Sequence, residues 1–307
     1  MRIKFIKFIF YLLSIVSKIL NFLVILLTKI ISKFVFLGQG NFYNKNFSTE
    51  YYFIKDHIYN NMTIKAKVNN FWDFWRLHNF ETYPIDEIIK DRHLFEKKQK
   101  KIVYYEIGAN VGLSALFISK ALENNGKIYA FEIEPANFKA MNDNFLINKF
   151  KNYNLINLGI SNENKIKKFY YNISHKNNNH NLPVSSMGMH SMKFNEKIHD
   201  KNIYSNLIFM KFENIIDDFN LDYPTHLFID AYGAENEIIN SIFSTKKKQM
   251  LPYKIMVDIE EIGISNVENS HIYKILKQNN YKLKKYFFEK GEGNIPDSYK
   301  AIFEINE

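Results

Sequence analysis

Short apolar runs alternate with segments of helical spacing from residue 101 onward. The apolar runs predict strands at 101–108, 127–134, 152–160, 225–230 and 254–260. Helical spacing predicts helices at 112–123, at 135–148, from residue 234 and at 270–280, and two strands close the chain near 281–288 and 299–305. Near-continuous apolar strands that alternate with helices are typical of a parallel sheet covered on both faces. The pattern therefore predicts an α/β fold built on a mostly parallel sheet.

Residues 1–37 have a different pattern, because they contain no acidic residue, no Gly and no Pro. Between Phe8 and Thr28 the only charged residue is Lys18, and a stretch of about 20 residues is long enough to span a membrane. On a helical wheel the lysines of the segment gather in one narrow sector, as in a helix that lies along anionic headgroups; they are Lys4, Lys7, Lys18, Lys29 and Lys33. We predict a hydrophobic, amphipathic N-terminal helix that binds an anionic membrane surface. Spanning and lying flat stay open as alternatives, and so does a soluble helix buried in a core or an oligomer.

The segment 38–98 is polar and rich in aromatic residues. Helical spacing predicts a helix at 71–77 and another at 84–92, where Pro84 suits a first helical turn. The lysine-rich stretch 97–101 is typical of a solvated linker. The predicted organisation is therefore a membrane-associating helix (1–37), a connector with short helices (38–98) and a main domain (99–307).

Composition excludes several kinds of site. The chain contains no Cys, so it has neither disulfides nor thiolate chemistry. The formal net charge is +9, which would suit nucleic acid or an anionic membrane surface. The lysines are spread through the whole chain, however, and no nucleic-acid-binding motif is present. We therefore expect no nucleic-acid partner.

Ligands of parallel sheets bind at the carboxyl ends of the strands, near the point where the strand order reverses. The first predicted strand ends in E-I-G-A-N-V-G (106–112), in which Gly108 and Gly112 would let a ligand approach the backbone. Glu132 follows Gly112 by 20 residues, the separation expected for an acid that binds the hydroxyls of a ribose. The predicted site thus binds a nucleoside.

The spacing of the glycines favours one kind of nucleoside cofactor. A dinucleotide site needs G-x-G-x-x-G, in which the middle Gly lets the backbone touch the pyrophosphate. Asn110 stands at the place of that middle Gly. S-adenosyl-L-methionine has no pyrophosphate, and its ammonium suits acids such as Glu106 and Asp230. We therefore expect S-adenosyl-L-methionine rather than NAD as the cofactor.

Several ordered motifs resemble one known family. They are E-I-G-A-N-V-G (106–112), Y-A-F-E-x-E-P-x-N-F (129–138), N-x-x-x-N (144–148), P-x-H-L-x-I-D-x-x-G-A-E (224–235) and M-V-D-I-E (256–260), with W-R-x-x-x-F-E-x-x-P (75–84) before them. Together they resemble the FkbM family of S-adenosylmethionine-dependent methyltransferases, over about residues 70–290. The resemblance does not include the N-terminal helix.

The resemblance implies a Rossmann-like class I methyltransferase fold. It places Glu106, Gly108, Asn110 and Gly112 around the methionine and ribose portions of the cofactor, and it places Glu132 on the ribose hydroxyls. Asp230 would face both the methyl donor and the acceptor. Family members are typically associated with O-methylation of sugars or secondary metabolites.

The chain departs from the family's pattern at LFIDAYGAE (227–235). The usual form has Lys two residues before the Asp and an acid two residues after it, where this chain has Phe228 and Tyr232. An ion pair can be exchanged for apolar groups at little cost in stability. The two aromatic residues therefore leave three alternatives, which are a neutral exchange, an altered acceptor pocket in which Tyr232 contacts the substrate, and a loss of activity.

Methyl transfer from a sulfonium requires mainly alignment of the reacting groups, together with a base for the proton of a hydroxyl acceptor. Asp230 is the first candidate for that base, or else it only orients the donor. His190 is a second, weaker candidate for contact with the substrate, whereas His226 starts its strand and is expected to be structural. No set of His and acidic residues has the spacing of a metal site, so we assign no metal ligands, although a Mg²⁺ requirement is not excluded.

Three functions are therefore compatible with the sequence. The first is a membrane-associated O-methyltransferase on the cytoplasmic side that modifies a sugar hydroxyl of a glycan or a lipid-linked saccharide. The second is a non-catalytic scaffold of the same fold in a membrane assembly. The third, an NAD-dependent oxidoreductase, is disfavoured by Asn110.

Overall fold

The structure is a computed structural model that describes residues 53–68, 77, 80–123, 125–172, 199–245, 247–260, 265–290 and 297–306. The predicted N-terminal helix, most of the predicted helix at 71–77, and the loop with His190 lie outside the described residues. Among the described residues, no helix is long and apolar enough to cross a membrane.

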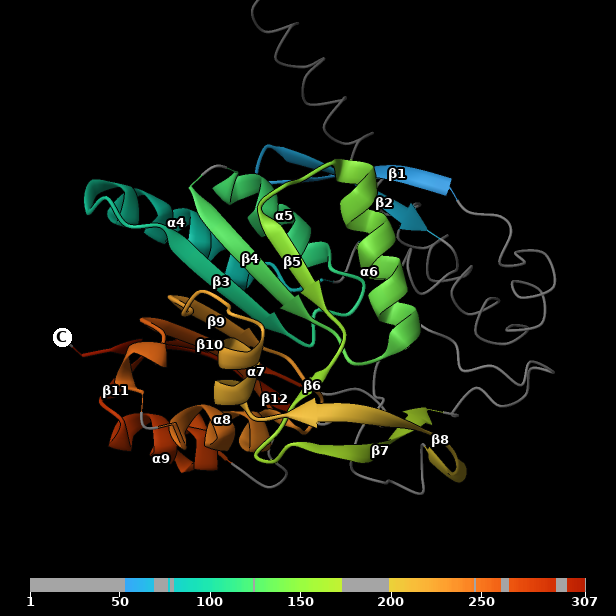
Figure 1. Cartoon of the computed structure of the whole chain (residues 1–307). Coiled ribbons are helices and arrows are strands. Elements are labelled where there is room, and N and C mark those ends of the chain that lie inside the picture. Colours follow the sequence, from blue (N-terminus) through green and yellow to red (C-terminus); the bar gives the residue numbers. More distant parts are fainter. Residues whose placement is uncertain are drawn as a thin grey trace, which may run out of the picture. The chain divides into compact units, whose positions relative to one another are not determined.

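A seven-stranded sheet with the order β11-β12-β10-β9-β3-β4-β5 forms the centre of the described part (Figure 1). Its strands are β3 (Ile102–Ile107), β4 (Gly126–Phe131), β5 (Tyr153–Ile156), β9 (His226–Ile229), β10 (Lys254–Ile259), β11 (Tyr281–Glu289) and β12 (Ser298–Ile305). The five strands from β5 to β10 pair in parallel, and β12 is antiparallel to both of its neighbours. From β3 the chain builds the sheet toward β5 and then returns to β9 on the other side of β3. The strand order therefore reverses between β3 and β9.

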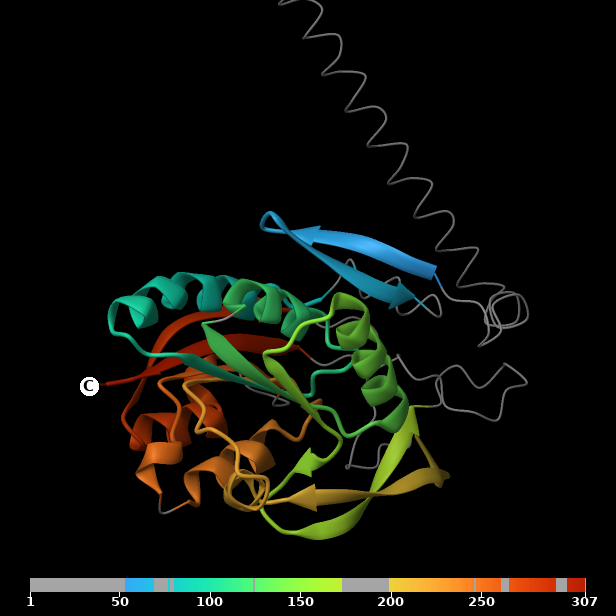
Figure 2. The same ribbon diagram turned by 45° about the horizontal axis from the view of Figure 1, so that its top comes forward.

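Helices cover both faces of this sheet (Figures 1 and 2). On one face lie α4 (Tyr83–Lys97), α5 (Leu113–Leu122) and α6 (Pro135–Asn148), and on the other lie α7 (Phe212–Asp218), α8 (Glu235–Phe243) and α9 (His271–Gln278). Two short 3₁₀ helices, η1 (Lys248–Met250) and η2 (Val267–Asn269), join these elements. The central strands β9 and β10 are buried along their whole length, as expected for parallel strands between two helical layers. The predicted α/β fold is confirmed.

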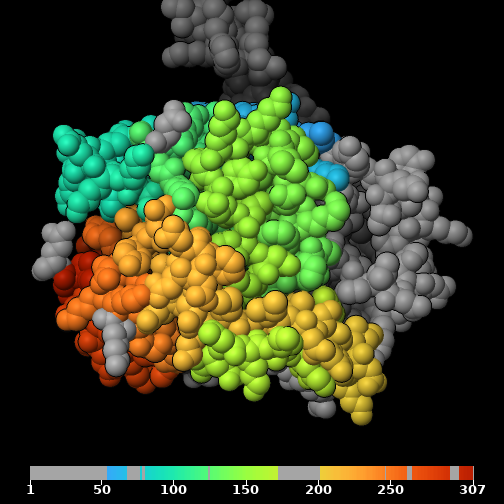
Figure 3. Space-filling model, in the orientation of Figure 1, coloured from blue at the N-terminus to red at the C-terminus, as the bar shows by residue number. Residues whose placement is uncertain are grey.

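Most predicted elements agree with the structure, but the predicted strand at 152–160 is wrong as a single strand. Residues 153–156 form β5 in the main sheet, whereas β6 (Gly159–Ile160) belongs to a separate three-stranded sheet of order β6-β8-β7. The other strands of this sheet, β7 (Lys165–Asn172) and β8 (His199–Met210), form an antiparallel ribbon at the surface of the face shown in Figure 3. Gly159 lets the chain pass close to β8, because a Cβ there would lie 2.4 Å from the ring of Phe209.

The described part of the segment 38–98 packs in the same core as the main domain. An antiparallel hairpin of β1 (Phe53–Tyr59) and β2 (Met62–Val68) was not predicted, and α4 begins one residue before Pro84 and runs to Lys97. Ile64 of the hairpin and Ile88 of α4 are buried in one hydrophobic cluster with residues of β3, α5 and α6. The boundary predicted at residue 98 therefore does not coincide with a break in the packing.

Candidate active site

The site lies at the carboxyl edge of the sheet, where the strand order reverses between β3 and β9. Glu106 of β3 pairs in register with Ala130 of β4 on one side and Phe228 of β9 on the other. Asp230 follows β9 directly, and its backbone N–H donates to the carbonyl of Ile107 at 3.0 Å. The fold thus brings the ends of the first and fourth predicted strands of the α/β unit side by side.

The two glycines of the turn after β3 are required by the chain's own packing. Gly108 has φ +85°, and a Cβ there would lie 1.8 Å from the carbonyl oxygen of Asp230. Gly112 has φ +79°, and a Cβ there would lie 2.7 Å from Cγ of Met141. We expected these glycines to make room for a ligand. The structure shows that they make room for β9 and α6, and their contact with a cofactor stays a prediction.

Glu132 fixes the turn that Asn110 occupies. Its carboxylate accepts the backbone N–H of Asn110 at 2.7 Å and that of Glu134 at 2.8 Å. Asn110 has φ +55°, a left-handed conformation that Asn tolerates better than most residues. Its side-chain oxygen Oδ1 is buried without a hydrogen-bond partner. The turn is thus held in place by backbone bonds and presents an unsatisfied polar atom.

Glu106 is the most buried acid of the site, with 2% of its surface exposed. Oε1 accepts a short hydrogen bond from the hydroxyl of Ser114, and Oε2 is buried without a partner. Burial raises the pKa of Glu106 to about 7, although the hydrogen bond from Ser114 opposes this rise. A buried carboxylate oxygen without a donor is costly. The ammonium group of S-adenosyl-L-methionine would donate to the unpaired oxygen of Glu106. The ribose hydroxyls of the same cofactor would suit Asn110 and Glu132, so these residues fit the cofactor.

The turn after β9 is strained and is tied down by Glu235. Tyr232 has φ +44° and Gly233 has φ +84°, and the first value is unusual for a bulky residue. Oε1 of Glu235 accepts the backbone N–H groups of Ala231 at 3.2 Å and Gly233 at 2.9 Å. Burial raises the pKa of Glu235 to about 7, against these hydrogen bonds. Glu235 therefore holds Tyr232 in place at the sheet edge.

Asp230 lies among other carboxyl groups. Burial and the charges of Asp258, Glu81, Glu260 and Glu235, in that order, raise the pKa of Asp230 well above its ordinary value. Burial also raises the pKa of Asp258 to about 6 and that of Glu260 to about 8. A positive charge placed beside these carboxyl groups would oppose this rise in pKa and favour their ionised forms.

Tyr83 packs against Phe228, one of the two residues at which the chain departs from the family's pattern. The ring of Phe228 meets that of Tyr83 edge-on, with 5.5 Å between the centroids. The hydroxyl of Tyr83 is buried without a hydrogen-bond partner, and burial together with the charges of Asp258, Glu81, Asp230 and Glu106 raises its pKa. No predicted role in the sequence points to Tyr83 as a site residue. The resemblance at residues 75–84 was a signal that could have found it.

Two groups of three acidic residues lie close enough to suggest a metal ion, but each surrounds a lysine. In the first, Lys300 forms ion pairs with Glu81 at 2.6 Å and with Glu289, and Asp258 completes the group. In the second, Nζ of Lys254 lies 2.5 Å from Glu87, 2.5 Å from Asp91 and 3.1 Å from Glu304. An ammonium thus stands where a metal ion would be needed.

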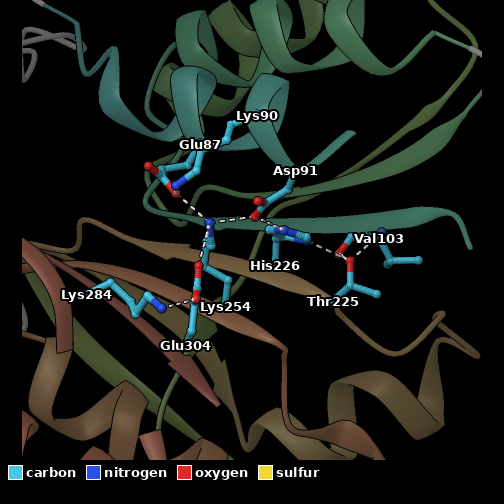
Figure 4. Close-up of polar contacts among 9 residues, drawn as sticks. All are labelled: Glu87, Lys90, Asp91, Val103, Thr225, His226, Lys254, Lys284 and Glu304. Carbon is cyan, nitrogen blue, oxygen red and sulfur yellow. Dashed lines mark hydrogen bonds and ion pairs between the residues drawn. The ribbon is translucent and has the colours of Figure 1, made fainter. Parts of the chain in front are cut away.

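The second group lies at the opposite edge of the sheet from the site (Figure 4). His226 and Lys254 begin β9 and β10, and Glu304 faces Lys254 in register. Nε2 of His226 lies 3.1 Å from Asp91, and Nδ1 lies 2.9 Å from the hydroxyl of Thr225. Burial lowers the pKa of His226. The expectation that His226 is structural is confirmed.

The fold brings together most of the predicted site residues. Glu106 lies near the end of β3 and Glu132 directly follows β4, whereas the other predicted residues lie in the two turns after β3 and β9; these are Gly108, Asn110, Gly112, Asp230 and Tyr232. Their roles toward cofactor and acceptor stay predictions. The structure adds Ser114, Glu235 and Tyr83, which the sequence analysis did not assign to the site.

The strand order, with its reversal beside β3 and an antiparallel strand near one edge, is that of a class I methyltransferase. The sequence matches the model of the Methyltransferase FkbM domain over residues 106–283. This match extends over more than half of the 307 residues. The chain therefore belongs to the FkbM family, and it is an S-adenosyl-L-methionine-dependent methyltransferase.

Solved structures with some similarity are also methyltransferases. A precorrin-6y C5,15-methyltransferase from Geobacter metallireducens has 15% identity and a TM-score of 0.38, over 71% of this chain and 89% of that chain. Aeropyrum pernix fibrillarin with natively bound S-adenosyl-L-methionine has 11% identity and a TM-score of 0.38, over 66% of each chain. An rRNA methylase from Streptococcus thermophilus has 11% identity and a TM-score of 0.36, over 67% of this chain and 88% of that chain. At these scores the likenesses carry no conclusion about function. The sequence has no significant match among curated proteins.

Proposed function

We propose that this methyltransferase modifies a hydroxyl group of a saccharide, either a glycan or a lipid-linked sugar. The observation that carries the proposal is the position of Asp230. Its carboxyl group lies where the strand order reverses, beside the turn of Gly108, and accepts no hydrogen bond from any described residue. A hydroxyl needs a base when it is methylated, and Asp230 is placed to accept its proton.

The raised pKa of Asp230 agrees with this role. When bound, S-adenosyl-L-methionine supplies the methyl group and carries a positively charged sulfonium. A positive charge nearby lowers the pKa of a carboxyl group, so a bound sulfonium would favour ionised Asp230. The hydroxyl oxygen of the acceptor would bond to the methyl carbon as the bond from that carbon to sulfur breaks with its electron pair going to sulfur, and Asp230 would accept the hydroxyl proton. Once the positive charge is consumed, the acidic surroundings again favour protonated Asp230.

Calorimetry with S-adenosylhomocysteine and turnover of radiolabelled S-adenosyl-L-methionine with saccharide acceptors test the proposal. We expect cofactor binding in the wild type and in Asp230→Asn, and methylation of a saccharide by the wild type alone. Binding without turnover on any saccharide would instead favour a non-catalytic scaffold. Retention of full activity by Asp230→Asn would contradict the assigned base.

We further propose that residues 1–37 hold the enzyme on the cytoplasmic side of a membrane, near a lipid-linked acceptor. The lysine sector of this segment supports attraction to anionic lipid. Flotation with vesicles that contain or lack anionic lipid tests this. We expect the full chain to float with anionic vesicles and the chain without residues 1–37 to stay behind. A full-length protein that stays with the soluble fraction would contradict the proposal.

Tyr232 and His190 stay candidates for contact with the acceptor. Glu235 holds the turn of Tyr232, which stands two residues after Asp230 in the chain. Tyr232 can offer a ring face and a hydroxyl to a sugar. Methylation kinetics of Tyr232→Phe and His190→Ala would show a raised KM for the acceptor if these side chains contact it.

A further inference from the structure

We infer that the acceptor carries an ammonium group, which binds to Asp258 and Glu260 while the acceptor hydroxyl faces Asp230. This inference rests on the proposed function and names the chemical class of the saccharide as amine-bearing. It begins with the position of the two acids. Asp258 lies near the carboxyl end of β10, and Glu260 directly follows the strand.

The register of the sheet places this acid pair next to Asp230. Ile229 of β9 pairs with Val257 of β10, so Asp230 and Asp258 are the next residues along two adjacent parallel strands. On the other side, Asp258 pairs with Lys300 of β12. From Glu106 outward, the acids Asp230 and Asp258 thus follow one another across the sheet edge. Glu106 and the turn after β3 serve the donor, which leaves Asp258 and Glu260 one strand further from it.

Asp258 itself indicates a missing partner. It is 7% exposed, and its oxygen Oδ1 is buried without a hydrogen-bond partner. Glu260 likewise receives no hydrogen bond or ion pair from any described residue. The neighbouring carboxylates are already in use, because Lys300 pairs with Glu81 and Glu289, and Glu235 accepts two backbone N–H groups. Ser298 donates a hydrogen bond to the carboxylate of Asp258, so among the described residues one oxygen of Asp258 and the carboxyl group of Glu260 lack a donor.

An ammonium suits carboxylate oxygens without a hydrogen-bond donor better than a divalent metal ion does. An ammonium offers three N–H donors to separate acceptors, whereas Mg²⁺ demands an octahedral shell of oxygen ligands. Lys300 already stands between two of the nearest carboxylates. The whole chain carries a net charge of +9, so general attraction would favour anionic ligands. A preference for a cation has to come from these local acids.

A pair of matched oligosaccharides tests the inference. Chitosan tetrasaccharide and its fully N-acetylated counterpart share one skeleton and differ in their ammonium groups. Both are titrated by calorimetry into the full chain saturated with S-adenosylhomocysteine, and spermidine serves as a cation without a sugar. We expect the chitosan tetrasaccharide to bind at least tenfold more tightly than the N-acetylated one.

Charge-removing variants locate the preference. Asp258→Asn and Glu260→Gln are each expected to reduce it severalfold, and the double variant is expected to abolish it. Glu268→Gln, in the exposed part of η2, removes one negative charge elsewhere and is expected to leave the preference unchanged. Binding of S-adenosylhomocysteine to every variant shows that the fold and the donor site are intact.

The pH dependence of binding is a second test. The groups that face the pair are Lys300 of β12, Glu81 before α4, Glu289 of β11, Glu235 of α8 and Asp230 after β9. Because only ionised carboxylates attract an ammonium strongly, binding of spermidine, whose amines stay protonated over this range, is expected to weaken from pH 8 to pH 5.5.

Each outcome decides between the two proposals. Equal affinity for both tetrasaccharides would overturn the inference and leave the saccharide proposal intact, and so would a preference that survives the double variant. Binding of spermidine without either tetrasaccharide, lost in the double variant, would support the ammonium site and contradict the saccharide. Binding of none of the three would overturn the inference.

Discussion

The acidic groups around Lys254 and Lys300 lie on the same face of the main sheet, one where its parallel strands begin and the other where they end. They differ in how many of their polar atoms have a hydrogen-bond or ion-pair partner. At the edge where β9 and β10 begin, Lys254 contacts three carboxylates, and Asp91 also contacts His226. At the edge where these strands end, Lys300 pairs with two carboxylates and leaves Oδ1 of Asp258 and the hydroxyl of Tyr83 without partners.

The difference separates structure from function. A buried charged group without its partners costs stability, so it persists where something else satisfies it or where a reaction needs it. The paired edge holds α4 against the sheet through Glu87 and Asp91. The unpaired edge coincides with the reversal of strand order, where a parallel sheet binds its ligands. The unpaired atoms at this edge thus agree with the site that the sequence motifs predict.

The largest expected effect is the loss of the cation at the paired edge. Lys254→Met leaves buried carboxylates without a counter-charge, so we expect the free energy of unfolding to fall by about 3–5 kcal/mol. Lys284→Met is the matched control, because Lys284 is half-exposed and pairs only with Glu304, and its loss is expected to cost less than about 1 kcal/mol. Denaturant unfolding measures both. Equal losses would show that the Lys254 group is not the structural counterpart of the site.

Removal of a charge at the unpaired edge is expected to act on catalysis instead. Asp230→Asn should reduce methyl transfer by about 10²–10⁴-fold, the usual contribution of a general base. The free energy of unfolding should stay the same or rise, because the variant removes a charge from among like charges. Asp218→Asn, at an exposed position of α7, is the control for both measurements. A large loss of stability in Asp230→Asn would place Asp230 with the structural group.

The pH dependence of stability follows from the acids of the site. Burial raises the pKa of Glu235 from 4.5 to about 7, so its carboxyl group binds protons more tightly in the folded state. Its contribution to stability is fully present below pH 4.5 and is lost as the pH rises through 7. Between pH 5 and pH 7 we expect this group to contribute a fall of about 2 kcal/mol.

Glu235→Gln should flatten this fall, because a Gln oxygen still accepts the N–H groups of Ala231 and Gly233 but does not titrate. Glu235→Ala should be less stable at every pH, since both donors lose their acceptor. Thermal unfolding over the same pH range compares the variants. An unchanged pH dependence in Glu235→Gln would show that another group titrates.

The smallest expected effect concerns the strained turn. Tyr232 has φ +44°, and such backbone strain costs about 1–3 kcal/mol when a non-glycine residue bears it. Tyr232→Gly should therefore raise the free energy of unfolding by about 1 kcal/mol while it weakens use of the acceptor. Tyr232→Phe keeps the strain and removes only the hydroxyl. If both variants use the acceptor as the wild type does, Tyr232 serves packing alone.

The sequence alone predicts the strands of the main sheet and the helices α5, α6, α8 and α9, because buried parallel strands and their helices leave a strong apolar pattern. It also located the turn residues of the site, from Glu106 to Gly112 and from Asp230 to Glu235, since each directly follows a strand. It did not predict the β1–β2 hairpin or the β7–β8 ribbon. Both ribbons have polar or exposed positions along one side, so their apolar signal is weak.

Which acids have hydrogen-bond or ion-pair partners depends on contacts that form only in the folded chain. Along the chain Asp230 and Asp258 each stand between two apolar residues, whereas Asp91 stands between Lys90 and Arg92, and these neighbours do not show which acid is partnered. Contacts between residues 135 to 163 positions apart give Asp91 its His226 and Lys254, whereas the fold gathers Asp230 and Asp258 with other acids. The same is true of Gly108, whose need follows from the carbonyl of Asp230 rather than from a ligand. The pattern of neighbouring residues predicts whether a position is buried. The charges around that position come from strands that meet only when the sheet forms.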